Sequence, residues 1–74
     1  MNIYVLTISD NFGSYTPRVF KTNKEAKDYV AKKKAEIGSD EHIKAIKTLS
    51  NGFEAQFIDD TFLEYKIYML ELKD

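Results

Sequence analysis

Apolar side chains recur along five short stretches of the chain, at about residues 2–9, 15–21, 42–50, 53–58 and 61–72. These stretches are rich in the β-branched and aromatic residues that favour strands, whose side chains point alternately to the two faces of a sheet. At about residues 23–37 the apolar positions instead repeat every three or four residues, which is typical of a helix. The pattern predicts one small α+β domain over residues 1–74, ordered ββαβββ, in which an antiparallel-rich twisted sheet carries one helix on one face.

The last predicted strand is apolar on both of its faces. One face holds Phe62, Tyr68, Leu70 and Leu72, and the other holds Leu63, Tyr65, Ile67 and Met69. A strand with one solvated face would alternate apolar and polar residues, so this strand is expected inside the sheet. The first strand is also apolar on both faces, and we expect the two to be neighbours. A buried helix is the alternative interpretation, since short apolar runs fit either element.

The second strand is predicted at an edge of the sheet. It contains Pro17, and proline has no amide hydrogen to donate to a neighbouring strand. Residues 10–14, which precede this strand, are turn formers with Phe12 at the tip of the turn. Phe12 is either an exposed contact for a partner or a lid folded back over the core. We favour the lid, because large aromatic side chains tend to be buried.

The helix has a clear predicted start and end. Thr22 followed by Glu25 fits a capping box at its first turn. Gly38 is expected to end it in a left-handed conformation. The stripe turned toward the sheet is expected to hold Ala26, Tyr29, Val30, Lys33 and Ile37, with the ammonium group of Lys33 reaching outward to solvent.

Residues 42–50 fit either a strand or a second helix. As a helix, this stretch would end at Asn51 and Gly52; as a strand, it would lead into the same pair, which is a strong hairpin signal. A two-residue turn at Asn51 and Gly52 sets Ile46 opposite Phe57 in an apolar cross-strand pair. This pairing favours the strand.

A single helix covers only one face of such a sheet, so the second apolar face needs other cover. The sheet could close on itself as a half-barrel, pack against a second copy or dock a different protein, or a modest patch could stay exposed. The edge formed by the second strand could also accept a strand from a partner. The candidate partner-binding residues are Phe12, Tyr15, Tyr65, Ile67 and Met69.

The chain offers little reactive chemistry. It contains no cysteine, which excludes disulfides and thiolate metal sites. Its one histidine, His42, lacks further residues spaced to complete a metal site, and we interpret it as a solvated residue. The sequence contains no glycine-rich phosphate loop and no nucleophile motif. We therefore predict no catalytic residue, no cofactor, no metal and no enzymatic activity.

Charge is distributed unevenly along the chain. The net charge of −1 argues against non-specific binding of nucleic acid by the whole molecule. Lysines nevertheless gather on the helix, and those that could contact phosphates are Lys24, Lys27, Lys32 and Lys34. Nucleic-acid binding through this flank is an alternative function, although a solvated helix face is the simpler interpretation.

These features together favour a small non-enzymatic protein-interaction module. We expect an adaptor, regulator or inhibitor that docks a protein partner, or a second copy in a homodimer, through a sheet face or an edge strand. An inhibitor encoded by a phage or another mobile element would fit this profile. The N-terminus lacks the pattern of a signal peptide and no run is long enough to span a membrane, so a cytoplasmic location without a membrane partner is expected. A structural subunit of a larger assembly is a further alternative.

Overall fold

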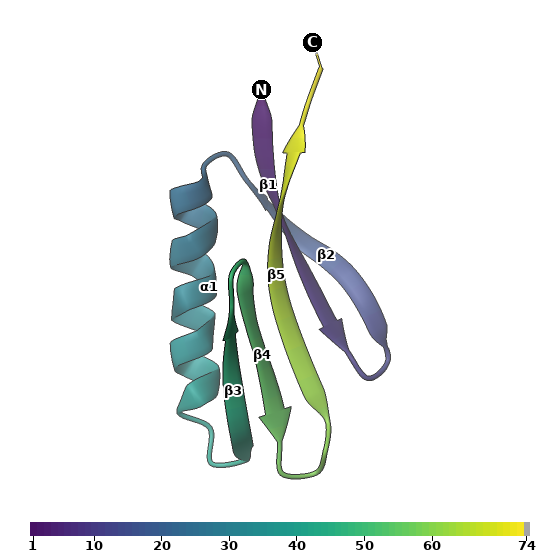
Figure 1. The fold of residues 1–74 in the computed structure, drawn as a ribbon, viewed down its shortest axis with the longest axis vertical. Helices are drawn as coiled ribbons and strands as arrows, with labels where there is room; N and C mark the ends of the chain where they lie inside the picture. The colour runs from purple at the N-terminus through teal and green to yellow at the C-terminus, as the bar shows by residue number, and fades with distance from the viewer. Residues whose placement is uncertain (74) are drawn as a thin grey trace.

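The computed structural model describes residues 1–73 and contains one five-stranded antiparallel sheet and one helix (Figure 1). The elements are β1 (Asn2–Asp10), β2 (Gly13–Phe20), α1 (Asn23–Gly38), β3 (Ile43–Leu49), β4 (Gly52–Phe57) and β5 (Phe62–Glu71). The strand order is β2-β1-β5-β4-β3. The predicted α+β class and ββαβββ order are therefore confirmed, and residues 42–50 contain a strand.

The last strand of the chain lies in the middle of the sheet. On one side β5 pairs with β1 from Asn2 opposite Glu71 to Asp10 opposite Leu63. On its other side β5 pairs with β4, but only as far as Lys66 opposite Gly52. The prediction of an interior strand beside the first strand is confirmed, and the alternative of a buried helix is wrong.

The second strand forms one edge of the sheet, as Pro17 predicted. Leu6 lies opposite Arg18 and Ile8 lies opposite Tyr15. Between these pairs, Thr16 and Pro17 of β2 face the single residue Thr7 of β1. A residue in a β-bulge at a sheet edge does not have to donate a hydrogen bond to the neighbouring strand, so proline, which lacks the N–H group, is tolerated there.

The turn of the β3–β4 hairpin lies one residue earlier than predicted, which shifts the cross-strand pairing by two residues. Ile46 lies opposite Ala55, not opposite Phe57, because the turn residues are Ser50 and Asn51. Gly52 belongs to β4, where a Cβ atom would overlap the carbonyl oxygen of Tyr65 on β5. The glycine is therefore required for close approach of two strands, and not for a turn with positive φ. A shift of two residues keeps every side chain on its predicted face.

The helix starts where the capping box predicted. Thr22 Oγ1 accepts a hydrogen bond from the backbone N–H of Glu25 at 3.1 Å. The predicted end is wrong in detail, because Gly38 is the last helical residue and Ser39, with φ of −85°, forms the cap. Gly38 faces β3, where its missing side chain makes room for the Cδ1 atom of Ile46.

Replacing the helix cap gives a first testable prediction. The substitution Thr22→Ala removes the acceptor for the Glu25 N–H group and should lower the free energy of unfolding by about 1 kcal/mol. Thr22→Ser keeps the hydroxyl and serves as the control, with little change expected. Urea titration followed by circular dichroism measures both; equal losses in the two variants would contradict a capping role.

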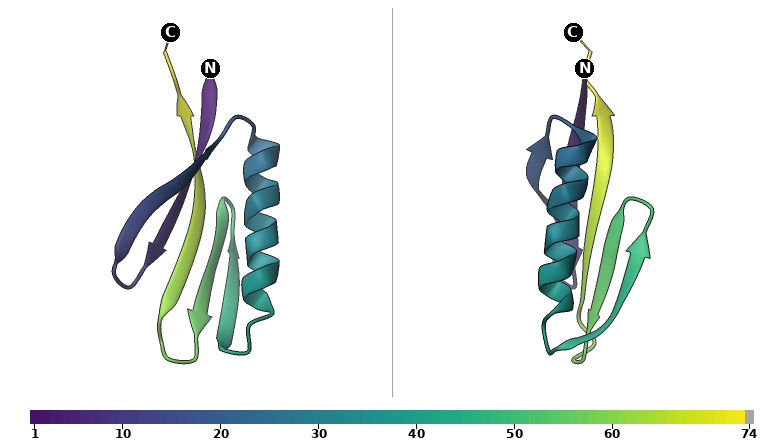
Figure 2. Two further views of the ribbon diagram at one scale, coloured as in Figure 1. Left: turned by 180° about the vertical axis from the view of Figure 1, so that it is seen from behind. Right: turned by 90° about the vertical axis from the view of Figure 1, so that its left-hand side faces the viewer.

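The core is a single layer between α1 and one face of the sheet. Its buried side chains are Leu6, Ile8, Phe20, Ala26, Val30, Phe53, Ala55 and Tyr65. The rings of Phe53 and Tyr65 stack with their centroids 4.9 Å apart at the centre of this layer. The views in Figure 2 show the strands fanning out in a twisted, open sheet beside α1. Because the edge strands β2 and β3 do not pair with each other, the sheet does not close on itself, and that alternative is wrong.

Candidate protein-docking surface

An apolar surface lies on the sheet face that α1 does not cover. The cross-strand register sets Val19, Val5 and Tyr68 in one row of neighbouring residues. Ile3 and Leu70 form the next row, and the N–H of Leu72 donates to the carbonyl of Met1 at 2.7 Å to add a third pair. We call these residues the terminal patch: Met1, Ile3, Val5, Val19, Tyr68, Leu70 and Leu72.

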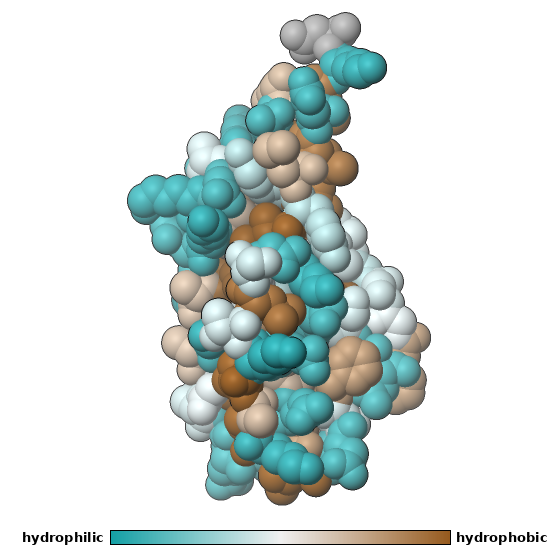
Figure 3. All heavy atoms as spheres, in the orientation of Figure 1, coloured by the Kyte–Doolittle hydropathy of each residue, from teal (hydrophilic) through white to brown (hydrophobic). Residues whose placement is uncertain are grey.

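The terminal patch is exposed in the isolated chain. Five of its side chains, on Met1, Val19, Tyr68, Leu70 and Leu72, are 45% to 69% exposed. Together these five residues expose an area on the order of 500 Å², a size at which patches on small proteins often serve as binding sites. Figure 3 shows brown, apolar surface near the end of the molecule that carries the two termini.

The structure separates the three β5 residues proposed as partner contacts from the terminal patch. Tyr65 is buried against Phe53 and α1, and burial raises the pKa of its hydroxyl. Ile67 is packed against the core from the same face. Met69 also points to the helix face but is 58% exposed, because α1 does not cover this end of the strand. The bare face belongs instead to the alternate residues, Tyr68 and Leu70.

Phe12 is almost fully exposed to solvent at the tip of the β1–β2 loop. Its side chain is 97% exposed, so the predicted lid over the core is wrong. The loop is held by Asp10, whose Oδ1 accepts hydrogen bonds from the N–H groups of Phe12 and Gly13 at 2.8 and 3.1 Å. Tyr15, the fifth proposed contact, is 54% exposed and lies opposite Ile8 on the helix side of β2. Neither residue adjoins the terminal patch.

A groove opens on the helix side of the sheet, between α1, the tip of the β3–β4 hairpin and the end of β5. Its volume is about 540 Å³. Its lining combines apolar groups with a few polar ones: Tyr4, Asn23, Lys27, Val30, Ala31, Leu49, Ser50, Asn51, Gly52, Ile67 and Met69. Brown surface between α1 and β5, around the hairpin tip, shows this apolar lining in Figure 3.

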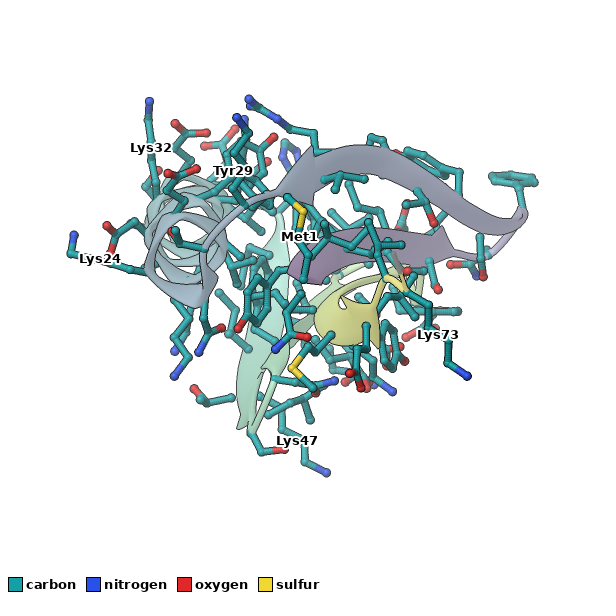
Figure 4. The ribbon with its side chains drawn as sticks, turned by 90° about the horizontal axis from the view of Figure 1, so that it is seen from above. Met1, Lys24, Tyr29, Lys32, Lys47 and Lys73 are labelled. Atoms are coloured by element: carbon teal, nitrogen blue, oxygen red, sulfur yellow. The ribbon has the colours of Figure 1, made fainter. Side chains whose placement is uncertain are left out.

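The helix lysines do not converge on a common point. Lys24 pairs with Asp28 at 2.8 Å, and Lys34 donates to Thr48 Oγ1 at 2.6 Å. Lys24 and Lys32 point away from the sheet in different directions (Figure 4). Phosphate groups are bound best by cations that converge, so this geometry gives little support to the nucleic-acid alternative.

Two aspartates with lowered pKa values stabilise local turns. The backbone N–H and the ring of His42 lower the pKa of Asp40, whose Oδ1 lies 2.8 Å from that N and 3.0 Å from Nδ1. The hydroxyl and N–H of Thr61 lower the pKa of Asp59 in the same way. Within residues 1–73, no group of three or more possible ligands is placed to hold a metal ion. No helix in this part of the chain has the length and apolar character to cross a bilayer.

The fold and its bare face define a class of small α+β protein with one helix on one side of an open antiparallel sheet. Comparison of the chain with models of protein families, with curated proteins and with solved structures finds no match. The case for a function therefore rests on the geometry of the molecule itself.

Proposed function

We propose that this chain is a small non-enzymatic protein-interaction module, and that its terminal patch docks a second copy of the chain. The observation that carries the proposal is the row of apolar side chains across β2, β1 and β5 on the bare sheet face, which are exposed on β2 and β5 and half-buried on β1. Burying such a surface is favourable by about 25 cal/mol per Å² of apolar area. A role as adaptor, regulator or inhibitor is consistent with this behaviour.

A second copy suits the terminal patch in composition and charge. The patch contains no charged side chain, and its one charged group, the N-terminal ammonium of Met1, donates to the Leu72 carbonyl at 3.3 Å. A two-fold axis through the patch therefore brings the apolar side chains of one copy against those of the other. Below the patch, the same face carries both signs of charge, with Lys47 opposite Glu54 and Lys66 3.4 Å from Glu64. The net charge of −1 on each chain gives little repulsion between copies.

The area available on this face also fits a dimer. A stable interface buries about 800 Å² on each partner. The terminal patch supplies more than half of that area, and the charged residues beside it can form the polar rim that such interfaces have. Sheet-on-sheet packing at about 10 Å is a common way to cover a bare face of this kind.

Sedimentation equilibrium of the purified chain tests this proposal. We expect a dimer with a Kd in the micromolar range, and we expect Leu70→Glu to weaken it at least tenfold, or by about 1.4 kcal/mol, because two carboxylates would meet near the axis. An equimolar mixture of the Leu70→Glu and Leu70→Lys variants should dimerise again. Ile58→Glu is the matched control, since Ile58 is 63% exposed in the β4–β5 loop, away from the patch.

Two results would overturn the proposal. One is a wild-type chain that remains monomeric at millimolar concentration, about a thousandfold above the expected Kd. The other is a dimer that Leu70→Glu and Ile58→Glu weaken equally, which would place the interface elsewhere. Circular dichroism of each variant confirms that the substitutions leave the fold intact.

A further inference from the structure

The C-terminal half of β5 has an unpaired edge on the side of the β3–β4 hairpin. β4 pairs with β5 only up to Lys66, whereas β1 pairs with β5 as far as Glu71. The next residue of β5, Ile67, is hydrogen-bonded to the turn residue Asn51. The carbonyl of Asn51 accepts from the N–H of Ile67 at 2.8 Å, and its Nδ2 donates to the carbonyl of Ile67 at 3.3 Å. No strand of the described chain follows on this side.

The free backbone groups of this edge can be assigned from the alternation of the ladder. In an antiparallel ladder the N–H and the C=O of one residue point to the same side of the strand. Those of the next residue point to the opposite side. Ile67 bonds toward the hairpin, whereas Leu72 bonds toward β1, through its N–H to Met1. Met69 and Glu71 therefore direct two donors and two acceptors away from β1, into the space above the hairpin tip.

The groove described above lies beside this edge, on the helix side of the sheet. Met69 belongs to both the unpaired edge and the groove lining, and Ile67, at the last bonded position before that edge, also lines the groove. A strand added next to β5 would continue the line of β4, and its residue opposite Met69 would share the face of Met69. That side chain would enter the groove between Val30 and Leu49, both of which line it.

We propose that this edge and groove bind an extended segment of another protein by strand addition. Main-chain hydrogen bonds to Met69 and Glu71 would fix the segment, and one apolar side chain would fill the groove. Lys27 lines the groove, and none of the ion pairs among residues 1–73 includes it. The segment is therefore expected to carry an acidic residue within reach of Lys27. This inference goes beyond the proposed dimer, because the groove and the terminal patch lie on opposite faces of β5.

Selection from a displayed library of random nine-residue peptides tests this inference on the full chain. We expect enriched peptides with an apolar residue, a nearby Asp or Glu and no proline between them. In hydrogen exchange measured by NMR, a bound peptide should slow exchange of the Met69 and Glu71 amides at least tenfold, because they gain partners in the added strand. Lys27→Glu should shift the enriched charge from acidic to basic.

Variants at the edge and in the groove make the test specific. Met69→Pro removes the N–H that faces the peptide but no N–H that bonds to β1, and proline is tolerated at such edge positions. It should weaken the selected peptide about tenfold, the effect of one lost hydrogen bond. Ala31→Glu places a charge in the groove from an exposed helix position and should weaken binding similarly, even if the proline variant does not fold. Ala35→Glu, one helical turn away and also exposed, is the control.

Clear results would overturn the inference. One is a failure to enrich any peptide, and another is a bound peptide that leaves the exchange of the Met69 and Glu71 amides unchanged. A third is that, without peptide, these two amides are already protected and lose this protection when the chain is diluted, which would assign the edge to a second copy. The Leu70→Glu variant allows the same selection on a monomer, so failure of the dimer and failure of peptide binding can be told apart. A peptide that binds Leu70→Glu and the wild type equally would support the groove independently of the terminal patch.

Discussion

Replacing Phe53 by alanine should lower the free energy of unfolding by about 3–5 kcal/mol. Phe53 is completely buried, and its ring stacks on that of Tyr65 at the centre of the core cluster that residues 1–73 form. Removing the ring leaves a cavity that the β4 and β5 backbones cannot close, because both strands are fixed by their pairing. Small domains often have a total stability of about 5 kcal/mol, so the variant should be largely unfolded at 37 °C.

Urea titration followed by the near-ultraviolet signal of the tyrosines measures this effect. Phe12→Ala deletes the same ring from a side chain that is 97% exposed, and we expect a change within about 0.5 kcal/mol. A Phe53→Ala chain as stable as Phe12→Ala would show that the stacked pair does not form the centre of the core.

The second large effect is expected from Gly52→Ala, at the first residue of β4. The added Cβ would overlap the carbonyl oxygen of Tyr65 and lie 2.7 Å from its carbonyl carbon, and both atoms belong to the β5 backbone. Backbone atoms in a central strand cannot move aside without parting β4 from β5. We expect a loss of about 3 kcal/mol or more, although alanine in a strand is ordinarily no worse than glycine.

Gly38→Ala is the matched control for this substitution. There the added Cβ would lie 3.3 Å from the Cδ1 atom of Ile46, which is the flexible end of a side chain. The gain in helix propensity, up to about 1 kcal/mol, should offset the crowding. Thermal unfolding of the two variants compares them directly. If Gly52→Ala proved as harmless as Gly38→Ala, the close approach of β4 and β5 at this residue would be wrong.

Most of the architecture could be predicted from side-chain pattern alone. Pro17 identified the edge strand, Thr22 and Glu25 identified the start of the helix, and the double-sided apolar pattern placed β5 inside the sheet. The hairpin register was wrong because Gly52 was interpreted as a turn residue. Its actual requirement, the proximity of Tyr65, is a contact 13 residues away in sequence that no local pattern reveals.

The docking surface was harder to predict, for a physical reason. Alternation along β5 sorts its residues into two sets, but it does not say which set the helix covers. Phe53 and Ala55 could have indicated the answer, because their pairing with Tyr65 and Leu63 brings the most apolar positions of two strands to one face. Phe12 was placed correctly at a loop tip, yet its exposure depends on the Asp10 hydrogen bonds that hold the loop away from the core.

The position of β5 has a consequence for how the molecule acquires its structure. During synthesis the β1–β2 hairpin, α1 and the β3–β4 hairpin leave the ribosome before the strand that joins them. Isolated two-stranded hairpins are only marginally stable in water, so these parts can adopt no lasting arrangement until residues 62–71 emerge. Pairing of β1 with β5 then closes a loop of more than fifty residues, from Asp10 to Leu63 at its shortest. Folding should therefore be slow for a chain of this size and should begin only after translation of the final strand.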